Sequence, residues 1–313
     1  MMSGLATQVQ VMRALRELVP GVRPGELSRD GRVLRWVEAG AGQPAVVLDA
    51  ALGEPGTLAW AGVLPEVAQH TRAIAYDRAG LGTSDPVSPP ALDTELADLA
   101  AVAAQAGGGC ILVGHSWGAL LAQLVTLQQP DLVAGLVLVD PADETYWESL
   151  PAQVHLDNQQ SWAVLEDSHA KGEHAPMITG VFGDFARQLT DGPNLQALIQ
   201  DAYLASYASR SQIEMVRLEN QLLTSSTPAI TAIRRATSLP DIPLVVFSAT
   251  KTVEGTPAED RERWTRLNGE LAATVPDSRH VVLADTSHAV NQEQPHAIAE
   301  AITGMIDLLR SRD

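Results

Sequence analysis

The sequence predicts an α/β protein in which helices cover both faces of a mostly parallel central sheet. Short apolar runs, rich in β-branched residues, alternate with longer segments whose apolar residues recur at helical spacing. Such alternation is typical of βαβ units, because parallel strands need a long crossover connection. It stops after residue 142 and returns near residue 238. We therefore expect one core domain, 1–142 and 238–313, with a helical cap inserted at 143–237.

The first part of the chain is expected to form a leading helix and then most of the strands. Leu5, Val9, Met12 and Leu15 recur at helical spacing and predict a helix over residues 5–18. The elements expected next are strands at 32–38, 45–48 and 72–76, a helix at 91–106, a strand at 110–113, a helix at 118–129 that Pro130 ends, and a strand at 136–139.

The inserted segment shows helical spacing and no convincing strand. Helices are expected around residues 146–150, 178–189, 195–206 and 212–223. After Pro240 the alternation of short and long segments resumes. The remaining elements expected are a strand at 244–247, a helix at 259–274, a strand at 280–283 and a helix at 295–310.

Composition and charge exclude several classes of protein. Of the 313 residues, 45% are hydrophobic and 19% are charged, which is ordinary for a globular protein. The formal net charge of −17 repels phosphate backbones and anionic lipid, so neither nucleic acid nor a membrane is an expected partner. Cys110 is the only cysteine, so an internal disulfide is impossible. The start of the chain lacks the pattern of a signal peptide, and a cytoplasmic location is expected.

The strongest local signal is the run Gly114-His115-Ser116-Trp117-Gly118. It follows an apolar strand and precedes an apolar helix, which is the context that a nucleophile elbow requires. A side chain at position 114 or 118 would collide with neighbouring backbone in so sharp a turn. The turn lifts the Ser116 hydroxyl clear of the sheet and places it at a helix N-terminus, where negative charge is favoured. The alternative is a serine that merely caps a helix.

Three features of the chain resemble the α/β-hydrolase family, over residues from about 30 to 310. They are the elbow, the run Asp77-Arg78-Ala79-Gly80-Leu81-Gly82-Thr83-Ser84, which matches the family's D-R-x-G-x-G-x-S loop, and Thr286-Ser287-His288. The resemblance implies the α/β-hydrolase fold with a helical cap. It also implies that His288, between the last strand and the last helix, is the general base for Ser116. The 77–84 loop is expected to be architectural.

The acid of the triad has more than one candidate. The family places it after either of two strands, and the later strand, 244–247, is followed by no acid at the usual position. Asp140 stands at the carboxyl end of the earlier strand, where ligand chemistry gathers in such sheets. Its alternative role is that of a turn-forming Asp-Pro. We favour Asp140 as the acid over Glu254, Asp260 and Asp143.

A tetrahedral oxyanion needs hydrogen-bond donors as well. The family resemblance implies the backbone N–H of Trp117 as one donor and an N–H from the loop after the strand at 45–48, with Leu52 the expected residue, as the other. Family members often carry His-Gly in that loop, whereas this sequence reads Ala50-Ala51-Leu52-Gly53. The identity of the second donor therefore remains open at this stage.

Seven of the thirteen aromatic residues fall in the insertion, which would roof the serine. The expected pocket is apolar and lined by Trp117, Trp147, Phe182 and Phe185, which suits an uncharged ester. The alternative for most of these rings is the insertion's own core. We expect no cofactor, and no histidine pair stands at metal-ligand spacing with a carboxylate.

The function expected is hydrolysis of a carboxylic ester or related acyl bond of a small, largely apolar substrate, through an acyl-enzyme on Ser116. An amidase, lactonase or thioesterase would use the same residues. A dehalogenase or epoxide hydrolase of this fold would carry aspartate at position 116. Two alternatives from other classes are a cofactor-free oxygenase or perhydrolase on the same scaffold, and a non-catalytic binder of small ligands. The sequence does not define the substrate or the oligomeric state.

Overall fold

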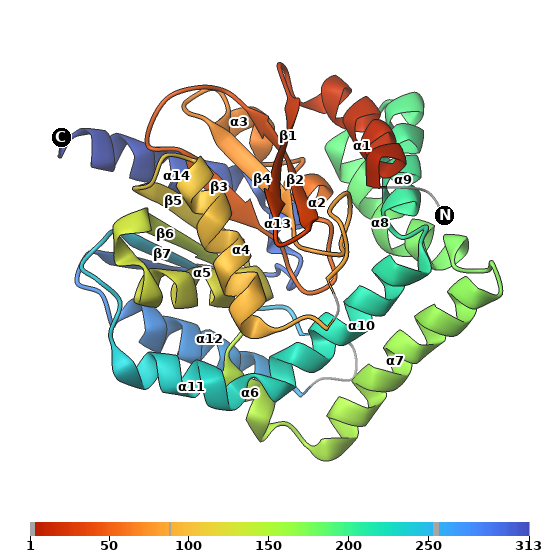
Figure 1. Ribbon diagram of the computed structural model, residues 1–313. Coiled ribbons are helices and arrows are strands. Elements are labelled where there is room, and N and C mark those ends of the chain that lie inside the picture. The colour runs from red at the N-terminus through yellow and green to blue at the C-terminus, as the bar shows by residue number, and fades with distance from the viewer. Residues whose placement is uncertain (1–3, 88, 253–256, 313) are drawn as a thin grey trace.

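The computed structural model describes residues 4–87, 89–252 and 257–312, and its centre is a single twisted sheet (Figure 1). In the described residues the sheet has eight strands, in the order β1-β2-β4-β3-β5-β6-β7-β8. β2 pairs antiparallel with both β1 and β4, and every other pairing is parallel. The strands are β1 (Arg23–Arg29), β2 (Arg32–Ala39), β3 (Val46–Asp49), β4 (Ala73–Asp77), β5 (Cys110–His115), β6 (Val133–Val139), β7 (Leu244–Ala249) and β8 (Ser278–Leu283).

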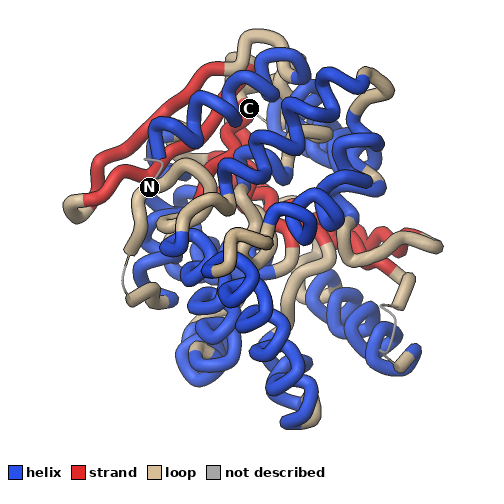
Figure 2. Tube along the Cα trace, turned by 90° about the vertical axis from the view of Figure 1, so that its right-hand side faces the viewer, coloured by secondary structure: helices blue, strands red, loops and turns tan. Residues whose placement is uncertain are grey.

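Two hydrophobic cores lie on the two faces of this sheet, because successive side chains of a strand point to opposite faces. Val46 and Leu48 of β3 belong to one core and Val47 to the other. The central parallel strands are buried on both faces, which is why they read as continuous apolar runs. In Figure 2 the strands are seen to lie between layers of helices, as the sequence predicts for the fold class.

Helices from different parts of the chain cover the two faces. α4 (Leu92–Gln105), α5 (Trp117–Gln128) and α12 (Ala258–Ala272) contribute to the core that holds Val47. The other core includes α1 (Gly4–Leu18), α14 (Pro295–Arg310) and three short helices. These short helices are α2 (Gly56–Ala59), α3 (Leu64–Val67) and α13 (Val290–Glu293).

The segment between β6 and β7 is entirely helical or loop. It holds α6 (Glu144–Ser149), α7 (Ala152–Ala170), α8 (Ala175–Leu189), α9 (Pro193–Ser206), α10 (Arg210–Ser225) and α11 (Thr227–Ala236). α8 and α9 pack together beside α1, and α7 packs along α10 (Figure 1). Residues 143–237, called the insertion below, thus reach from the carboxyl end of β6 to the helix that opens the chain.

The sequence analysis predicted neither the short helices α2, α3 and α13 nor the longer elements β1, α7 and α11. The residues of β1 are exposed or half-buried, because β1 is an edge strand and pairs only with β2. It therefore lacks the alternation of apolar and polar residues that identifies a strand. α7 buries only Leu165, so no apolar stripe marks it as a helix. α11 is amphipathic but short, and Pro228 follows its first residue.

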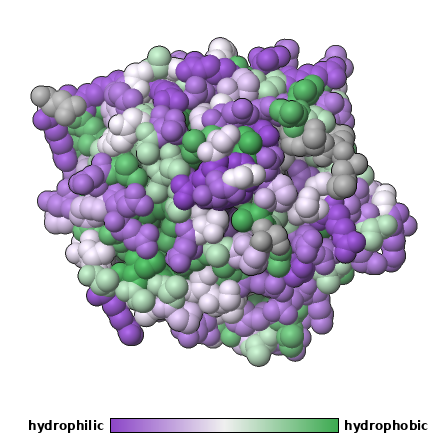
Figure 3. Space-filling view, in the orientation of Figure 1, coloured by the Kyte–Doolittle hydropathy of each residue, from purple (hydrophilic) through white to green (hydrophobic). Residues whose placement is uncertain are grey.

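The outer surface is largely polar on the face seen in Figure 3, with small hydrophobic patches between hydrophilic ones. Within the described residues, no helix combines the length and the apolar character needed to cross a membrane.

Candidate active site

The turn between β5 and α5 has the geometry of a nucleophile elbow. Ser116 has φ 52° and ψ −112°, a conformation that non-glycine residues rarely adopt. A Cβ on Gly114 would collide with the backbone at Gly118 and Ala119, and a Cβ on Gly118 with the carbonyl oxygens of Asp49 and Ala50. Both glycines are therefore required by close backbone contacts, as the sequence motif predicts. The turn leaves Ser116 on the wall of a cavity that His288 also lines.

His288 contacts the carboxylate of Asp140. Its Nδ1 lies 2.6 Å from Oδ2 of Asp140, which is fully buried at the carboxyl end of β6. Because a carboxylate only accepts hydrogen bonds, Nδ1 of His288 carries the proton and Nε2 is free to accept one. Burial lowers the pKa of His288, against the opposite effect of Asp140, and this favours the neutral ring that a general base requires.

Asp140 is also held by residues other than His288. Arg261 of α12 donates from both terminal nitrogens to its carboxylate, at 3.0 and 2.5 Å, and the N–H of Ala249 donates at 3.2 Å. Burial alone would raise the pKa of Asp140. The hydrogen bond and charge of His288, together with those of Arg261, outweigh burial and lower the pKa below its ordinary value. The acid is therefore ionised and fixed in direction.

The other candidates for the acid lie elsewhere. Asp143 caps α6, where its side chain accepts from the N–H groups of Thr145 and Tyr146. Asp260 lies on the wall of the cavity, but in the part of the chain that the structure describes it forms no ion pair with His288. Glu254 falls outside the described residues. Asp140 is the carboxylate that the structure brings to His288.

Two aromatic neighbours fix the position of His288. Nε2 of His115 donates to the carbonyl oxygen of His288 at 2.7 Å, and the two rings lie 4.8 Å apart. On another side the ring of Trp264 lies 5.0 Å from that of His288, and its Nε1 donates to the carbonyl of Pro141. Trp264 thus connects the base with the strand end that carries the acid. Sequence reasoning assigned neither residue to the site.

The loop after β3 lies against the elbow. The N–H of Gly118 donates to the carbonyl of Ala50 at 3.1 Å, and both Ala51 and Leu52 line the cavity. Trp117 opens α5 directly after Ser116. The two backbone positions expected to stabilise an oxyanion, Trp117 and Leu52, are therefore brought to the side of the nucleophile.

The cavity over Ser116 has a volume of about 520 Å³ and a largely apolar wall. Tyr146, Trp147 and Trp162 of the insertion form one part of the wall, and Trp264 of α12 forms another. The rings of Tyr146 and Trp264 lie 5.0 Å apart. Charged and amide side chains are also part of the wall, namely Asp157, Asn220, Lys251, Asp260 and Arg261.

Three residues expected in the pocket are not there. The Trp117 side chain is fully buried beneath the elbow, and its Nε1 donates to Glu95 at 2.7 Å. Phe182 stacks on Tyr203 at 3.9 Å, and Phe185 packs edge-on against the same ring, inside the core shared with α9. The prediction that Phe182 and Phe185 line the pocket was wrong because their rings pack in the interior of the insertion. The prediction for Trp117 was wrong because its ring is buried beneath the elbow. Trp147 does line the cavity.

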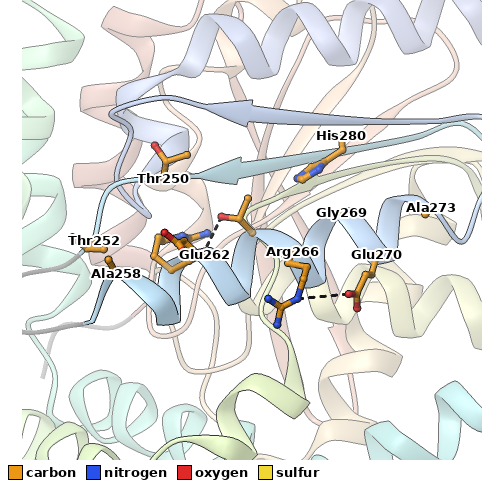
Figure 4. A pocket seen from close by; sticks show the side chains of 11 residues that line it. Thr250, Thr252, Ala258, Glu262, Arg266, Gly269, Glu270, Ala273 and His280 are labelled. Atoms are coloured by element: carbon orange, nitrogen blue, oxygen red, sulfur yellow. Dashed lines mark hydrogen bonds and ion pairs between the residues drawn. The ribbon is translucent and has the colours of Figure 1, made fainter.

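A second hollow of about 690 Å³ lies on the outer side of α12 (Figure 4). Its wall includes Thr250, Arg266, Glu270 and His280, but neither Ser116 nor His288. Nε2 of His280 is 2.8 Å from Oγ of Ser248, which also accepts from Asn268 behind the acid. Arg261, which binds Asp140, lines this hollow as well as the cavity over Ser116. Among the described residues, no cluster of His, Cys, Asp and Glu side chains is arranged to hold a metal ion.

Comparison with known families agrees with this geometry. A model described as the alpha/beta hydrolase family matches residues 30–301, which is most of the chain. The protein belongs to the alpha/beta hydrolase family. The match includes the elbow, Asp140 and His288.

Individual relatives are distant. The polyketide synthase ThaQ of Burkholderia thailandensis is 26% identical over 294 residues, which are 92% of this chain but only 12% of that much longer protein. An esterase from Thermogutta terrifontis superposes with a TM-score of 0.64 and 21% identity, over 92% of this chain and 98% of the other. A haloalkane dehalogenase variant from Bradyrhizobium elkanii superposes with a TM-score of 0.65 and 19% identity, over 93% and 98%. At these identities the solved structures establish the fold alone.

Proposed function

We propose that this hydrolase cleaves a carboxylic ester, or a related acyl bond, of a small and largely apolar substrate through an acyl-enzyme on Ser116. The observation that carries the proposal is a serine in the strained elbow that lines the same cavity as a histidine whose Nδ1 lies 2.6 Å from Asp140. Dehalogenases and epoxide hydrolases of this fold carry aspartate at the elbow, so a serine there favours acyl transfer.

Each step of the reaction has a residue to perform it. Nε2 of His288 takes the proton of the Ser116 hydroxyl as its oxygen attacks the carbonyl carbon. The oxyanion is stabilised by the N–H groups of Trp117 and Leu52. The imidazolium then gives its proton to the leaving alcohol. A water molecule, deprotonated by the same histidine, cleaves the acyl-enzyme and restores the serine.

The cavity supports an uncharged substrate of modest size. Its volume of about 520 Å³ falls within the range of ordinary small-molecule sites. The aromatic wall formed by Tyr146, Trp147, Trp162 and Trp264 favours an apolar acyl or alcohol group. Of the charged residues on the wall, Arg261 is already paired with Asp140. The cytoplasmic location and the absence of nucleic-acid and membrane partners remain predictions.

Turnover of p-nitrophenyl esters with acyl chains of increasing length tests the proposal. We expect Ser116→Ala to abolish turnover, by on the order of a millionfold as for other triad nucleophiles, while circular dichroism shows an unchanged fold. A fluorophosphonate should label the wild type at Ser116 and leave the variant unlabelled. Activity of the variant within about tenfold of wild type would contradict the mechanism. Oxygen consumption, or ligand binding without turnover, would favour the alternative classes.

A further inference from the structure

Arg78 is a buried arginine whose donors all reach the neighbourhood of the oxyanion loop. It comes from the D-R-x-G loop after β4, and its side chain is 2% exposed. Nε donates to Glu219 at 2.7 Å, and one terminal nitrogen donates to Asp49 at 2.6 Å and to the carbonyl of Ala50 at 2.7 Å. The other terminal nitrogen donates to the carbonyl of Ala51 at 2.6 Å and to Glu219 at 2.9 Å. The guanidinium thus fixes two consecutive carbonyl groups directly before Leu52.

Glu219 holds the same loop from the insertion. It is fully buried on α10, and its Oε2 accepts from the N–H of Gly53 at 2.5 Å. Tyr207, which precedes α10, donates from its hydroxyl to the carbonyl of Gly53 at 2.9 Å. Leu52 therefore stands between two residues whose backbone groups are held, Ala51 by Arg78 and Gly53 by the insertion. These contacts restrict the direction of the Leu52 N–H.

Glu95 reaches the other side of the oxyanion site. It lies on α4, buried, and its carboxyl group accepts from Nε1 of Trp117 at 2.7 Å. Burial, with the charge of Glu219 second, raises the pKa of Glu95 well above its ordinary value. The carboxyl groups of Asp49 and Glu219 bind the Arg78 guanidinium, and that of Glu95 lies within reach of its charge. A proton on Glu95 reduces the excess of negative charge in this cluster.

We infer that Arg78, Asp49, Glu219 and Glu95 form a positioning cluster that holds both N–H donors of the oxyanion site and makes their geometry depend on helix α10. The inference rests on the proposed function, since it concerns the oxyanion of acyl transfer. None of the four lines the substrate cavity, so Arg78, Asp49 and Glu219 act through the loop that carries Leu52, and Glu95 acts through the side chain of Trp117.

The physical reason for such a cluster is the geometric demand of the oxyanion site. Donors stabilise the oxyanion only when they already point to its position, because reorientation during the reaction would cost the energy gained. A loop in which Leu52 stands between an alanine and a glycine does not supply that rigidity by itself, whereas five hydrogen bonds from a buried arginine can. Since Glu219 belongs to α10, displacement of that helix would release Gly53 and two of the arginine's five hydrogen bonds. The insertion therefore does more than cover the substrate.

The test compares Glu219→Gln with Glu214→Gln, a half-exposed residue on the same helix. Glutamine keeps the size of the side chain but loses the charged pairing with Arg78. We expect Glu219→Gln to lower kcat about tenfold to a hundredfold, with KM within about threefold of wild type, since the loss affects the transition state. Amide hydrogen exchange of a peptide covering residues 50–54 should become faster. Glu214→Gln should change neither quantity.

The outcomes separate this inference from the proposed function. If the wild type cleaves no ester, the proposed function fails. The exchange measurement, which needs no substrate, then still decides whether the cluster holds the loop. Wild-type exchange in Glu219→Gln would overturn the inference, and so would faster exchange with unchanged kcat in an active enzyme. If Glu219→Gln does not fold, Arg78→Lys keeps the buried charge, loses the forked contacts and should show the same pattern.

Discussion

Two buried arginines contact carboxylates on opposite sides of Ser116, and they act on different parts of the site. Arg78, 2% exposed, divides its donors between two carboxylates and two backbone carbonyls beneath the oxyanion loop. Arg261, 7% exposed, directs both terminal nitrogens to Asp140 alone and lies 4.6 Å over the ring of Trp264. The first arginine fixes backbone. The second shares Asp140 with His288.

The comparison shows that a buried arginine paired with carboxylates can either fix the position of nearby backbone groups or change the pKa of a neighbouring side chain. Around Arg78 the carboxyl groups outnumber the cation, and a proton on Glu95 reduces that excess of negative charge without removing it. Around Asp140 the positive groups are Arg261 and, during the reaction, the His288 imidazolium. Arg261 therefore orients the carboxylate and at the same time weakens its attraction for a protonated histidine. Substitutions on each side should have different signatures.

The largest effect is expected on the acid–base side, from Asp140→Asn. The amide would still fit the buried site, but it cannot serve as acceptor for Nδ1 while also accepting from Arg261 at both atoms. The histidine would be left in the wrong tautomer, and kcat should fall by on the order of ten thousandfold with little change in fold. Steady-state kinetics and circular dichroism measure the two quantities.

Asp285→Asn is the matched control for this substitution. Asp285 is exposed in the loop that carries His288 and has φ 53°, which asparagine adopts as readily as aspartate. Its kcat should remain that of wild type. If Asp140→Asn kept kcat within about tenfold, Asp140 would not be the triad acid, although Ser116 and His288 could still be the nucleophile and base.

A smaller and qualitatively different effect is expected from Arg261→Met. Burial lowers the pKa of His288, and the positive charge of Arg261 lowers it further. Removing that charge raises the pKa of His288, so the base stays protonated to higher pH and the acidic limb of the pH–rate profile moves upward. The plateau should fall about tenfold or less, because His288 and the Ala249 N–H still hold Asp140. Profiles of kcat/KM against pH measure both effects.

Arg266→Met controls for the loss of an arginine from α12. Arg266 is 63% exposed and faces Glu270 in the hollow of Figure 4, which His288 does not line. Its profile should coincide with that of wild type. An acidic limb that stays in place for Arg261→Met would show that Arg261 orients Asp140 without affecting the charge of the base.

The sequence predicted the parts of the site that local geometry determines. Ser116 lies in a turn whose glycines are required by contacts within a few residues or with the adjacent strand, so a five-residue pattern was enough. The fold class could be predicted as well, because the alternation of apolar runs and helical segments is also a local property of the sequence. The positions of Asp140 and His288 at strand ends followed from chain order and from resemblance to the family.

Contacts between distant parts of the chain could not be predicted in this way. Glu219 meets Gly53 across 166 positions, and Arg261 meets Asp140 across 121. Helical spacing could have suggested one of these groups of residues, since Arg261, Trp264 and Asn268 recur on a single face of α12. Phe182 was misplaced because periodicity identifies an apolar face but not what covers it.

The smallest effect is expected on the oxyanion side, from Glu95→Gln, and it concerns stability. Because the pKa of Glu95 is raised on folding, the folded protein binds a proton that the unfolded chain releases above its ordinary pKa. The free energy of unfolding should therefore decrease as pH rises from below that value through the raised one. Glutamine resembles the protonated acid and can still accept from Trp117, so the variant should lose this dependence.

At about pH 4, below the ordinary pKa of a glutamate, the two proteins should be nearly equal, and at about pH 8 Glu95→Gln should be the more stable of the two. Urea unfolding at both pH values measures the difference. Glu300→Gln, an exposed position on α14, controls for the loss of one surface charge and should show no pH-dependent gain. If Glu95→Gln were destabilised at pH 8, Glu95 would be ionised in the folded protein, and Arg78 would have to balance three negative charges. All carboxyl groups near Arg78 would then be ionised, as Asp140 is beside Arg261. The two arginines would no longer differ in the protonation of the carboxyl groups around them.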